Sequence, residues 1–414
     1  MSKHRLFLLL AALYLAQGLP YGFFTQALPV LMREQGYSLT AISAVSLLFI
    51  PWATKFLWAP WVDHRGTRRG WLLPLQIAGV VLALGLTALP LDGHFTALFI
   101  ALFLFNCVAA TQDIATDGLA VRLLTAPQRG LGNGIQVGGY RIGMILGGGL
   151  LLWLYAVAGW AVMLTGMAAL LALTVIPVFF MHEPAPVAAR APAVVTPAFK
   201  QLMLGWWSRL RRPGMAGFIG LIAAYKFGDT MASAHIGPMM VDLGLSNTDI
   251  ALIKGTVGSV MALAGAALGG LLVWSLQRRT ALYLCGMLQA LSIAPYLLAS
   301  LGVAPLAMLW TGSVVESLCG AMATVALFTL MMDASDPEHG GTDYTLLACI
   351  IVLVMGTAVF AGGLIGDHLG YAVLLVVGMA ASAAGCLALV AALDRGSPLE
   401  RVNQAWRSPT SPQR

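Results

Sequence analysis

The chain has 414 residues, of which 59% are hydrophobic and only 10% are charged. A soluble globular protein carries about 25% charged residues, so this composition excludes an ordinary water-soluble domain and is typical of a chain solvated by lipid. The formal net charge is +6. The basic residues mark loop positions rather than one amphipathic stripe, which argues against a nucleic-acid partner.

Long apolar runs recur along the whole chain. A membrane-spanning helix needs about 20 apolar residues, and on that basis we predict an all-α polytopic membrane protein with twelve spans. The spans are expected at roughly 6–31, 39–60, 71–90, 95–119, 131–153, 160–181, 215–240, 248–275, 280–301, 305–331, 343–366 and 371–393.

The basic residues predict an orientation. Of the 23 Lys and Arg residues, 18 fall in one alternate set of gaps, four lie within spans, and Arg33 alone lies in the opposite set. Because cytoplasmic loops are enriched in Lys and Arg, we expect both termini to be cytoplasmic. Lys55 is one of the four within spans, and we expect it to reach the inner surface by snorkelling.

Span one carries a polar stripe that includes Gln17 and Tyr21, interrupted by Gly18 and Pro20. Polar stripes inside a bundle usually face a cavity, and Pro and Gly permit bending, so Gln17 and Tyr21 are predicted cargo contacts. A tyrosine also anchors helices at the membrane interface, and this alternative stays open.

Charged residues gather toward the cytoplasmic end of spans two and four. Asp113 and Asp117 share one helical face with Asn106, and arginines in the neighbouring loops are plausible partners for the two acids. We interpret this set as a cytoplasmic gate that locks conformations rather than as cargo ligands. Its predicted members are Asp63, Arg65, Arg69, Asp113, Asp117 and Arg122.

Span five combines a polar face with a buried arginine. Gln136, Tyr140 and Arg141 are predicted to bind cargo, with Arg141 as a clamp for an anionic or phenolate group. The alternative for Arg141 is a structural ion pair, because a charge at mid-bilayer needs a partner or a task. The glycines at 139, 143 and 147 predict close helix packing.

The gap at 182–213 is rich in Pro and Ala and basic, and it is interpreted as a cytoplasmic linker. It separates an N-terminal six-helix half, 1–181, from a C-terminal six-helix half, 214–394, and a cytoplasmic tail follows at 395–414.

The C-terminal half carries its own buried charges. Tyr225 and Lys226 are predicted cargo contacts, and Asp229, three residues after Lys226, can neutralise it on one helix surface. A proton on Asp229 would release Lys226, so this pair predicts a coupling mechanism; a static ion pair is the alternative. Glu316 in span ten is a second proton-coupling candidate, or a fixed partner of Arg141 or Lys254.

The two halves resemble repeats. The pattern G-x-S-x-T-x-I occurs at 36–42 and again at 244–250, an offset of 208 residues. The loop at 63–70, Asp-His-Arg-Gly-Thr-Arg-Arg-Gly, has a degenerate partner at 277–279. Two parallel six-helix repeats describe the major facilitator architecture, with cargo near the midplane.

Three segments carry a family resemblance: 17–22 (QGLPYG), 55–60 (KFLWAP) and 111–117 (TQDIATD). With the 63–70 loop, in which His64 replaces the usual Arg, they are similar to the AmpG-like permeases of the major facilitator superfamily. That group includes anhydromuropeptide importers and the RhtX/FptX siderophore permeases. Muropeptide permeases have two additional spans, so the resemblance favours the FptX-like siderophore branch. It implies import of ferric pyochelin across the bacterial inner membrane, in the form of a siderophore–iron complex.

The leading expectation is therefore a monomeric, proton-driven secondary transporter that works by alternating access. Anhydromuropeptide import is the first alternative and drug or metabolite export the next. An enzyme is not expected, because His182-Glu183 lacks the second histidine of H-E-x-x-H and no G-x-S-x-G motif occurs. The five cysteines lie singly, so no metal site and no cofactor is expected.

Overall fold

The computed structural model describes residues 3–35, 44–89, 95–181 and, apart from 206 and 209, residues 205–407. All regular elements in these ranges are helices. Three predicted features lie outside the described residues: the first copy of the repeated motif at 36–42, residues 182–204 of the linker, and the end of the tail at 408–414.

The helices follow one another closely, and several are interrupted by short π- or 3₁₀-turns. The first part of the chain contains α1 (Lys3–Gly22), η1 (Phe23–Ala27), α2 (Leu28–Glu34), η2 (Ala44–Phe49), α4 (Ile50–Thr54), η3 (Lys55–Leu57), α5 (Ala59–His64), α6 (Arg68–Gly85), η4 (Leu86–Ala88), α7 (Phe95–Leu123), η5 (Ala126–Gln128), α8 (Arg129–Ile145), η6 (Leu146–Leu150) and α9 (Leu151–Phe179). The later part contains α11 (Met215–Ser233), α12 (Ile236–Asp242), α13 (Asn247–Ile250), η8 (Ala251–Val257), α14 (Gly258–Ser275), α15 (Arg278–Leu291), α16 (Ala294–Ser300), α17 (Pro305–Ala334), η9 (Pro337–His339), α18 (Gly340–Arg395) and α19 (Glu400–Arg407).

Within the described ranges, eight helical stretches are long and apolar enough to cross a membrane. Two of them, Ala126–Phe179 and Pro337–Arg395, are 54 and 59 residues long, which is room for two spans each. Each contains a glycine with a left-handed backbone, Gly159 (φ 80°) and Gly370 (φ 81°). Both glycines fall in gaps between predicted spans. The total of twelve spans and the cytoplasmic termini stay predictions.

The second predicted span, 39–60, is not one continuous α-helix over its described residues. It consists of η2, α4, η3 and the start of α5. Prolines at 51 and 60 begin α4 and α5, and proline cannot donate the backbone hydrogen bond that would continue a preceding helix. The segment is therefore a chain of short turns, and it places Lys55 differently from the snorkelling that we expected.

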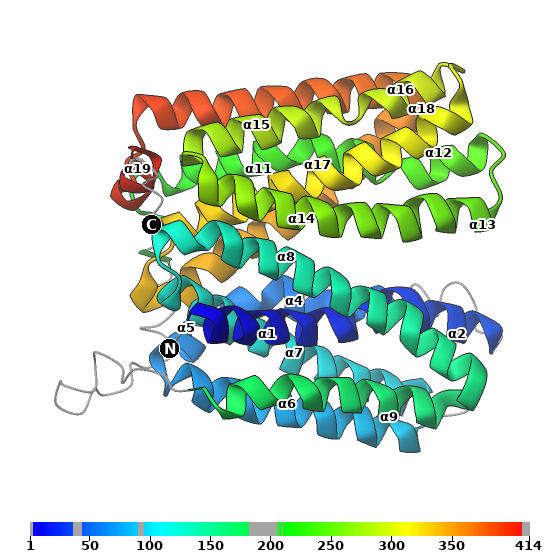
Figure 1. The fold of residues 1–414 in the computed structure, drawn as a ribbon, viewed down its shortest axis with the longest axis vertical. Coiled ribbons are helices and arrows are strands. Elements are labelled where there is room, and N and C mark those ends of the chain that lie inside the picture. The colour runs from blue at the N-terminus through cyan, green and yellow to red at the C-terminus, as the bar shows by residue number, and fades with distance from the viewer. Residues whose placement is uncertain are drawn as a thin grey trace. The chain divides into compact units, whose positions relative to one another are not determined.

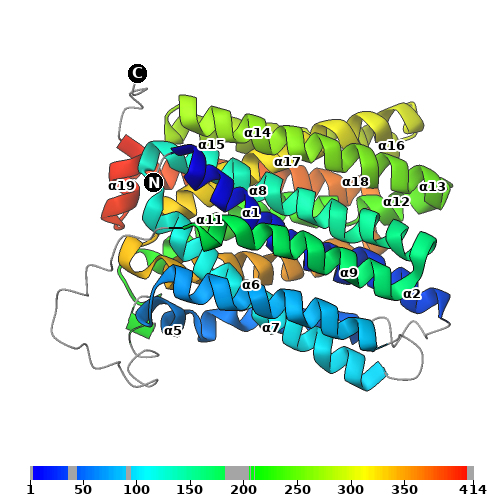
Figure 2. The same cartoon turned by 60° about the horizontal axis from the view of Figure 1, so that its bottom comes forward.

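The chain forms two compact units that are each discontinuous in sequence. The first comprises Met1–Leu123, Gly139–Trp207 and Asp336–Cys349; the second comprises Leu124–Gly138, Ser208–Ser335 and Ile350–Arg414. Within the first unit α6 runs beside α7 and α9, and within the second α17 runs beside α14 and α15 (Figures 1 and 2). The predicted division into sequential halves at 182–213 stays a prediction.

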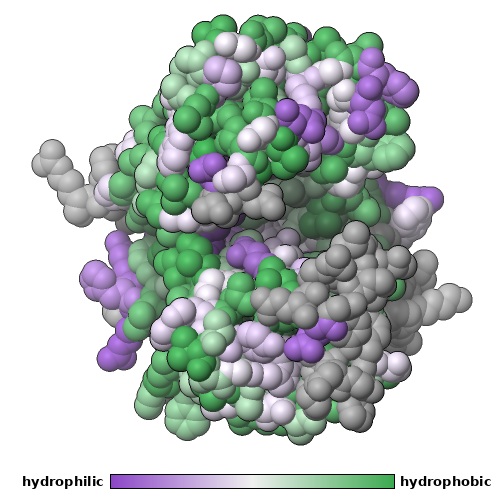
Figure 3. Space-filling view, turned by 90° about the vertical axis from the view of Figure 1, so that its right-hand side faces the viewer, coloured by the Kyte–Doolittle hydropathy of each residue, from purple (hydrophilic) through white to green (hydrophobic). Residues whose placement is uncertain are grey.

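Each unit has its own apolar interior, and much apolar surface also faces outward. Phe23, Phe105 and Met163 belong to the core of the first unit, and Met240 and Tyr296 to that of the second. Large side chains on the outside include Leu8, Val157, Leu173, Phe180 and Phe360, which are 61–71% exposed. Apolar side chains cover much of the face drawn in Figure 3. A surface of this kind is stable against lipid rather than against water.

Candidate functional site

A buried ion pair lies in the first unit, between Lys55 on η3 and Asp113 on α7. Lys55 is only 5% exposed, so the snorkelling interpretation is wrong. One turn after Asp113, Asp117 accepts a hydrogen bond from the hydroxyl of Tyr14 on α1 (3.0 Å). The two acids therefore join α7 to η3 and to α1. Removing one partner of a buried pair costs about 3–5 kcal/mol, because the remaining charge is left buried without compensation, so the two side chains depend on each other.

An aromatic cluster adjoins this ion pair. The ring centroid of Tyr21 lies 5.4 Å from those of Phe49 and Tyr140 and 6.4 Å from that of Trp52. All four rings are partly exposed. The ammonium group of Lys55 lies 5.4 Å from the ring centroid of Trp52, within the range of a cation–π contact. We call Tyr21, Phe49, Trp52 and Tyr140 the aromatic cluster.

Polar groups sit directly beside the aromatic cluster. Trp52 donates its indole N–H to Asn106 on α7 (2.9 Å), and the Asn106 amide in turn donates to the carbonyl of Leu102. Sequence reasoning identified Tyr21, Tyr140 and Asn106 but missed Phe49 and Trp52. An aromatic residue in an apolar run has no signal that separates a binding surface from an interface anchor.

Close packing of α1 against the later part of α8 brings Tyr21 and Tyr140 together. A Cβ atom on Gly18 would overlap with the carbonyl oxygen of Tyr140, and one on Gly143 would overlap with that of Leu15. Gly147 makes the same kind of approach to Leu19. The predicted packing role of the 139–143–147 glycine face is confirmed for Gly143 and Gly147, because only glycine permits these backbone distances.

The other predicted cargo residues of the first part of the chain occupy different environments. Gln17 is 1% exposed and neither of its amide atoms has a hydrogen-bond partner, so it points into the interior of the first unit. Gln136 is 8% exposed and belongs to the second unit. Arg141 lies on α8 with a partly exposed side chain. Their binding roles stay predictions.

A polar network lies inside the second unit and is centred on Lys226. Its ammonium group donates to Asp229 (2.8 Å), to Gln289 on α15 (3.3 Å) and to Thr324 on α17 (3.3 Å). Gln289 in turn donates to Ser382 on α18 (3.3 Å). The predicted contact between Lys226 and Asp229 is confirmed. Sequence reasoning missed Gln289, Thr324 and Ser382, which it had no means of placing opposite Lys226.

The two carboxylate oxygens of Asp229 differ in their hydrogen bonding. Oδ2 accepts from Lys226, whereas Oδ1 is buried without a hydrogen-bond partner. Tyr225, by contrast, is fully buried and donates to the backbone carbonyl of Leu282 (3.2 Å). Its hydroxyl is thus engaged with α15. Burying an oxygen of a carboxylate without a hydrogen-bond partner is costly. A proton-coupling role for Asp229 stays a prediction.

Glu316 and Lys254 complete the predicted titratable set of the second unit. Glu316 lies on α17 with a half-buried side chain. Lys254, on η8, donates to the backbone carbonyl of Ser233 at the end of α11 (2.9 Å). A proton-coupling role for Glu316 stays a prediction.

The predicted gate divides into separate contacts. Asp63 accepts hydrogen bonds from the backbone N–H groups of Gly341 (3.2 Å) and Thr342, from the Thr342 hydroxyl, and from Arg68. It therefore caps the first turn of α18, where free N–H groups and the helix dipole favour a negative charge. Arg65 stacks on Trp61, and Arg69 donates to the carbonyl of Phe179 (2.7 Å).

Two members of the predicted gate have partners on other transmembrane elements. Asp113 forms its ion pair with Lys55 rather than with a loop arginine, and Asp117 accepts from Tyr14. Arg122 lies near the end of α7. In the second unit a further anchor was missed: Asp333, whose side chain is fully buried, bridges Arg129 (2.7 Å) and Arg278 (2.8 Å). Gate roles for all these residues stay predictions.

The sequence profile of the Major Facilitator Superfamily matches residues 7–350. The chain belongs to this superfamily. It is 31% identical over 353 residues to the anhydromuropeptide permease of Escherichia coli K12, covering 83% of this chain and 70% of that one. It is 30% identical over 371 residues to a Haemophilus influenzae protein, covering 86% of each chain. The family is one of membrane transporters, and the protein is a polytopic transporter rather than an enzyme.

The fold agrees with that assignment. The structure of the proton:xylose symporter XylE matches with a TM-score of 0.70 at 14% identity, covering 97% of this chain and 99% of that one. The human organic anion transporter MFSD10 matches with a TM-score of 0.73, also at 14% identity, covering 94% of this chain and 100% of that one. At these identities the likeness establishes the helical fold alone.

Proposed function

We propose that this protein imports anhydromuropeptides, cell-wall fragments in which an amino sugar carries a short peptide, across the bacterial inner membrane. The observation that carries the proposal is the 31% identity with the E. coli anhydromuropeptide permease over 83% of the chain. The sequence resemblance favoured ferric pyochelin instead. The relatives reported above support the muropeptide cargo, so import of a siderophore–iron complex becomes the competing outcome of the test.

The aromatic cluster supports recognition of a sugar. A pyranose ring has an apolar face of C–H groups, which packs on an aromatic ring, and polar edges, which need hydrogen bonds. Partly exposed Tyr21, Trp52 and Tyr140 supply the ring faces, and Asn106 lies within hydrogen-bond distance of Trp52. Binding sites that combine aromatic walls with a few placed polar groups are the usual kind for small molecules.

The Lys226 network supports proton coupling. When a proton neutralises Asp229, the ammonium group of Lys226 keeps two neutral acceptors, Gln289 and Thr324. The lysine is therefore not left unsatisfied, and its charge is available to an anion such as a peptide carboxylate. The uptake of one proton thus changes the charge of the network from neutral to positive without breaking all of its hydrogen bonds.

Asp63 supports the alternating-access part of the proposal. It holds the first turn of α18 through backbone N–H groups, a contact that a helix movement would break and remake as a unit. Contacts of this kind give a transporter two discrete arrangements rather than a continuum.

The experiment is uptake of radiolabelled anhydromuropeptide by cells that lack the gene, with and without restored expression. Ferric pyochelin labelled with iron is run in parallel, and an uncoupler is added to each. The proposal predicts uncoupler-sensitive accumulation of the muropeptide that depends on the protein. Accumulation of ferric pyochelin alone would overturn the muropeptide cargo and restore the siderophore interpretation.

A pair of variants distinguishes a defect in cargo recognition from a decrease in protein abundance. Trp52→Ala is expected to reduce muropeptide uptake at low concentration, while Trp153→Ala, at a side chain that is 58% exposed on α9, serves as the matched control. Equal uptake by the two variants at equal protein abundance would contradict a sugar-binding role for the aromatic cluster.

A further inference from the structure

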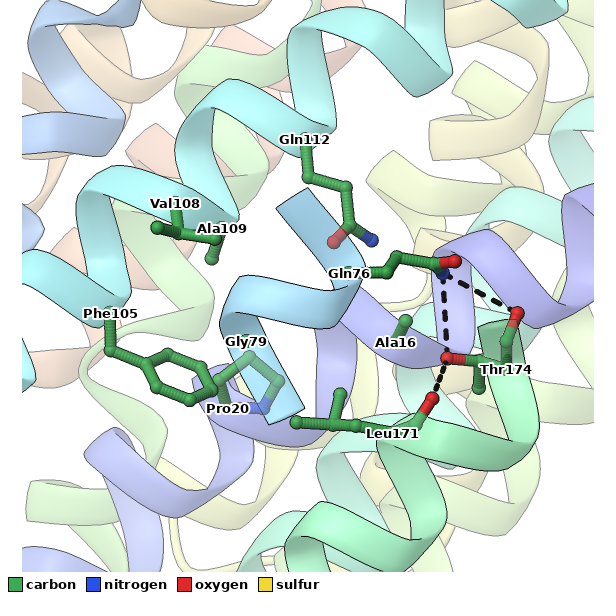
Figure 4. A pocket seen from close by; sticks show the side chains of 10 residues that line it. All are labelled: Ala16, Pro20, Gln76, Gly79, Phe105, Val108, Ala109, Gln112, Leu171 and Thr174. Atoms are coloured by element: carbon green, nitrogen blue, oxygen red, sulfur yellow. Dashed lines mark hydrogen bonds between the residues drawn. The ribbon is translucent and has the colours of Figure 1, made fainter. Parts of the chain in front are cut away.

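A small cavity lies inside the first unit, between α1, α6, α7 and α9, apart from the aromatic cluster (Figure 4). Its volume is about 10 Å³, counted as the space open to the centre of a water molecule. By that measure, one buried water molecule needs about 10–15 Å³. Its walls are mainly apolar, with two glutamines and a threonine among them: Ala16, Pro20, Gln76, Gly79, Phe105, Val108, Ala109, Gln112, Leu171 and Thr174.

The two glutamines are buried and only partly hydrogen-bonded. Gln76 is 3% exposed and Gln112 is 6% exposed. Oε1 of Gln76 and Nε2 of Gln112 have no hydrogen-bond partner. The first atom is an acceptor and the second a donor, and a buried polar atom without a partner costs about 1–3 kcal/mol as measured in proteins. Figure 4 shows Gln112 pointing from α7 toward Gln76, whose amide end lies beside Thr174.

Thr174 fixes which way the Gln76 amide is turned. Nε2 of Gln76 lies 3.5 Å from both the carbonyl oxygen and the hydroxyl oxygen of Thr174. The Thr174 hydroxyl donates its hydrogen to Leu171 (2.6 Å), so toward Gln76 it can only accept. Because both Thr174 oxygens are acceptors, the NH₂ group of Gln76 must face them. Oε1 therefore faces away from Thr174.

Pro20 bears on the carbonyl oxygen of Ala16 as a second candidate acceptor. It lies inside α1 and has no backbone N–H, so it cannot donate to the carbonyl oxygen of Ala16, four residues before it. Ala16 and Pro20 both line the cavity. A donor on α7 and an acceptor on α6, together with Ala16 and Pro20 of α1, thus line a space of about the size of a single water molecule.

We propose that this cavity binds one water molecule that joins α1, α6 and α7. The water accepts a hydrogen bond from Nε2 of Gln112 and donates to Oε1 of Gln76 and to the carbonyl oxygen of Ala16. Three hydrogen bonds is the usual number for a buried water. It fixes α1 at Pro20, directly before Tyr21. The inference concerns the space between the helices of the first unit and does not depend on which cargo the protein carries.

The test is a structure of the whole protein in lipid nanodiscs at a resolution that shows ordered water. The proposal predicts one density peak within hydrogen-bond distance of Gln76, Gln112 and the Ala16 carbonyl. A structure without this peak, in which Gln112 donates directly to Gln76, would overturn it.

Thermal unfolding of purified variants gives an independent test. Gln76→Met and Gln112→Met should each lower Tm, because each leaves the other glutamine atom without its bridge. The Tm of the double variant should fall by less than the sum of the two single decreases, since both polar atoms are then absent. Strictly additive decreases in Tm would count against the water bridge, since they would mean that the two glutamines do not share a partner.

Pro20→Ala supplies an N–H group for the Ala16 carbonyl and should weaken the density peak by removing one acceptor. Pro177→Ala is the matched control, because Pro177 also lies inside a helix but the carbonyl it leaves belongs to Leu173, a residue 61% exposed on the outside of α9. An unchanged peak in Pro20→Ala would contradict the contact with Ala16.

Discussion

Among the described residues, each unit contains one buried Lys–Asp pair, and the two pairs are built differently. Lys55 and Asp113 come from η3 and α7, and the neighbouring Asp117 is tied to Tyr14 on α1. Lys226 and Asp229 lie three residues apart on α11 alone. The first pair therefore joins elements of the fold directly. The second joins them only through Gln289 and Thr324, which accept from the lysine and not from the aspartate.

The difference suggests separate roles for the two pairs in the proposed transport cycle. Removing the charge of Asp113 would leave Lys55 buried beside Trp52. Removing the charge of Asp229 leaves Lys226 with two acceptors, and Oδ1 of Asp229 has no hydrogen bond to lose. We therefore assign structural support to Lys55–Asp113 and proton coupling to Lys226–Asp229, as part of the proposed transport cycle.

The largest expected effect is on the Lys55–Asp113 pair. Asp113→Asn should destabilise the protein by about 3–5 kcal/mol, because it leaves a buried ammonium without its carboxylate. The measurement is Tm of the purified protein together with its abundance in membranes. The double variant Lys55→Met/Asp113→Leu should recover part of the loss; if Asp113→Asn alone were as stable as wild type, the structural assignment would be wrong.

The next effect concerns the frame that holds the aromatic cluster. Gly143→Ala should cost about 1–3 kcal/mol, because the new methyl group overlaps with the carbonyl of Leu15 on α1. Gly149→Ala is the control, since nothing lies near its Cβ position. Tm measures both. Equal stability of the two variants would show that α1 and α8 are not closely packed at this point.

In the second unit, Asp229→Asn should fold with a stability close to wild type and lose concentrative uptake. Each loss of about 1.4 kcal/mol in the free energy that drives accumulation corresponds to about a tenfold lower ratio of internal to external cargo. Exchange of labelled for unlabelled cargo without a gradient should persist, because it needs no net proton movement. Loss of exchange together with accumulation would place Asp229 in cargo binding or folding instead.

The smallest expected effect is at the aromatic cluster. Tyr21→Ala should raise KM for the muropeptide by about two- to tenfold, since an aromatic contact contributes about 0.5–1.5 kcal/mol. Tyr21→Phe should keep most of the affinity, because the ring face is retained. The measurement is initial uptake at a series of cargo concentrations, and a fall in the maximal rate with unchanged KM would speak against direct contact.

Sequence reasoning recovered features that depend on one helix at a time. The pair at Lys226 and Asp229 follows from a spacing of three residues, and the close approach at Gly143 follows from a repeat of four. Partners on other helices were missed, namely Gln289, Thr324, Asp333 and the Lys55 contact of Asp113. Spans that are apolar on every side give no period that fixes which face meets a neighbour, so the rotation of each helix is known only from the fold.

The cargo was the other uncertain point, for a different physical reason. Fold and charge placement are shared by transporters with many cargoes, so they identify the architecture and not the ligand. The motifs at 17–22, 55–60 and 111–117 led to the AmpG-like group, and the preference for its siderophore branch rested on the number of spans. The relatives support the muropeptide alternative instead.

Proton movement into liposomes tests the central claim most directly. The purified protein is reconstituted with a pH-sensitive dye inside, and anhydromuropeptide or ferric pyochelin is added outside. The account predicts internal acidification with the muropeptide only, and none with Asp229→Asn, although that variant still exchanges cargo. Muropeptide entry without acidification, or equal acidification by Asp229→Asn, would contradict it.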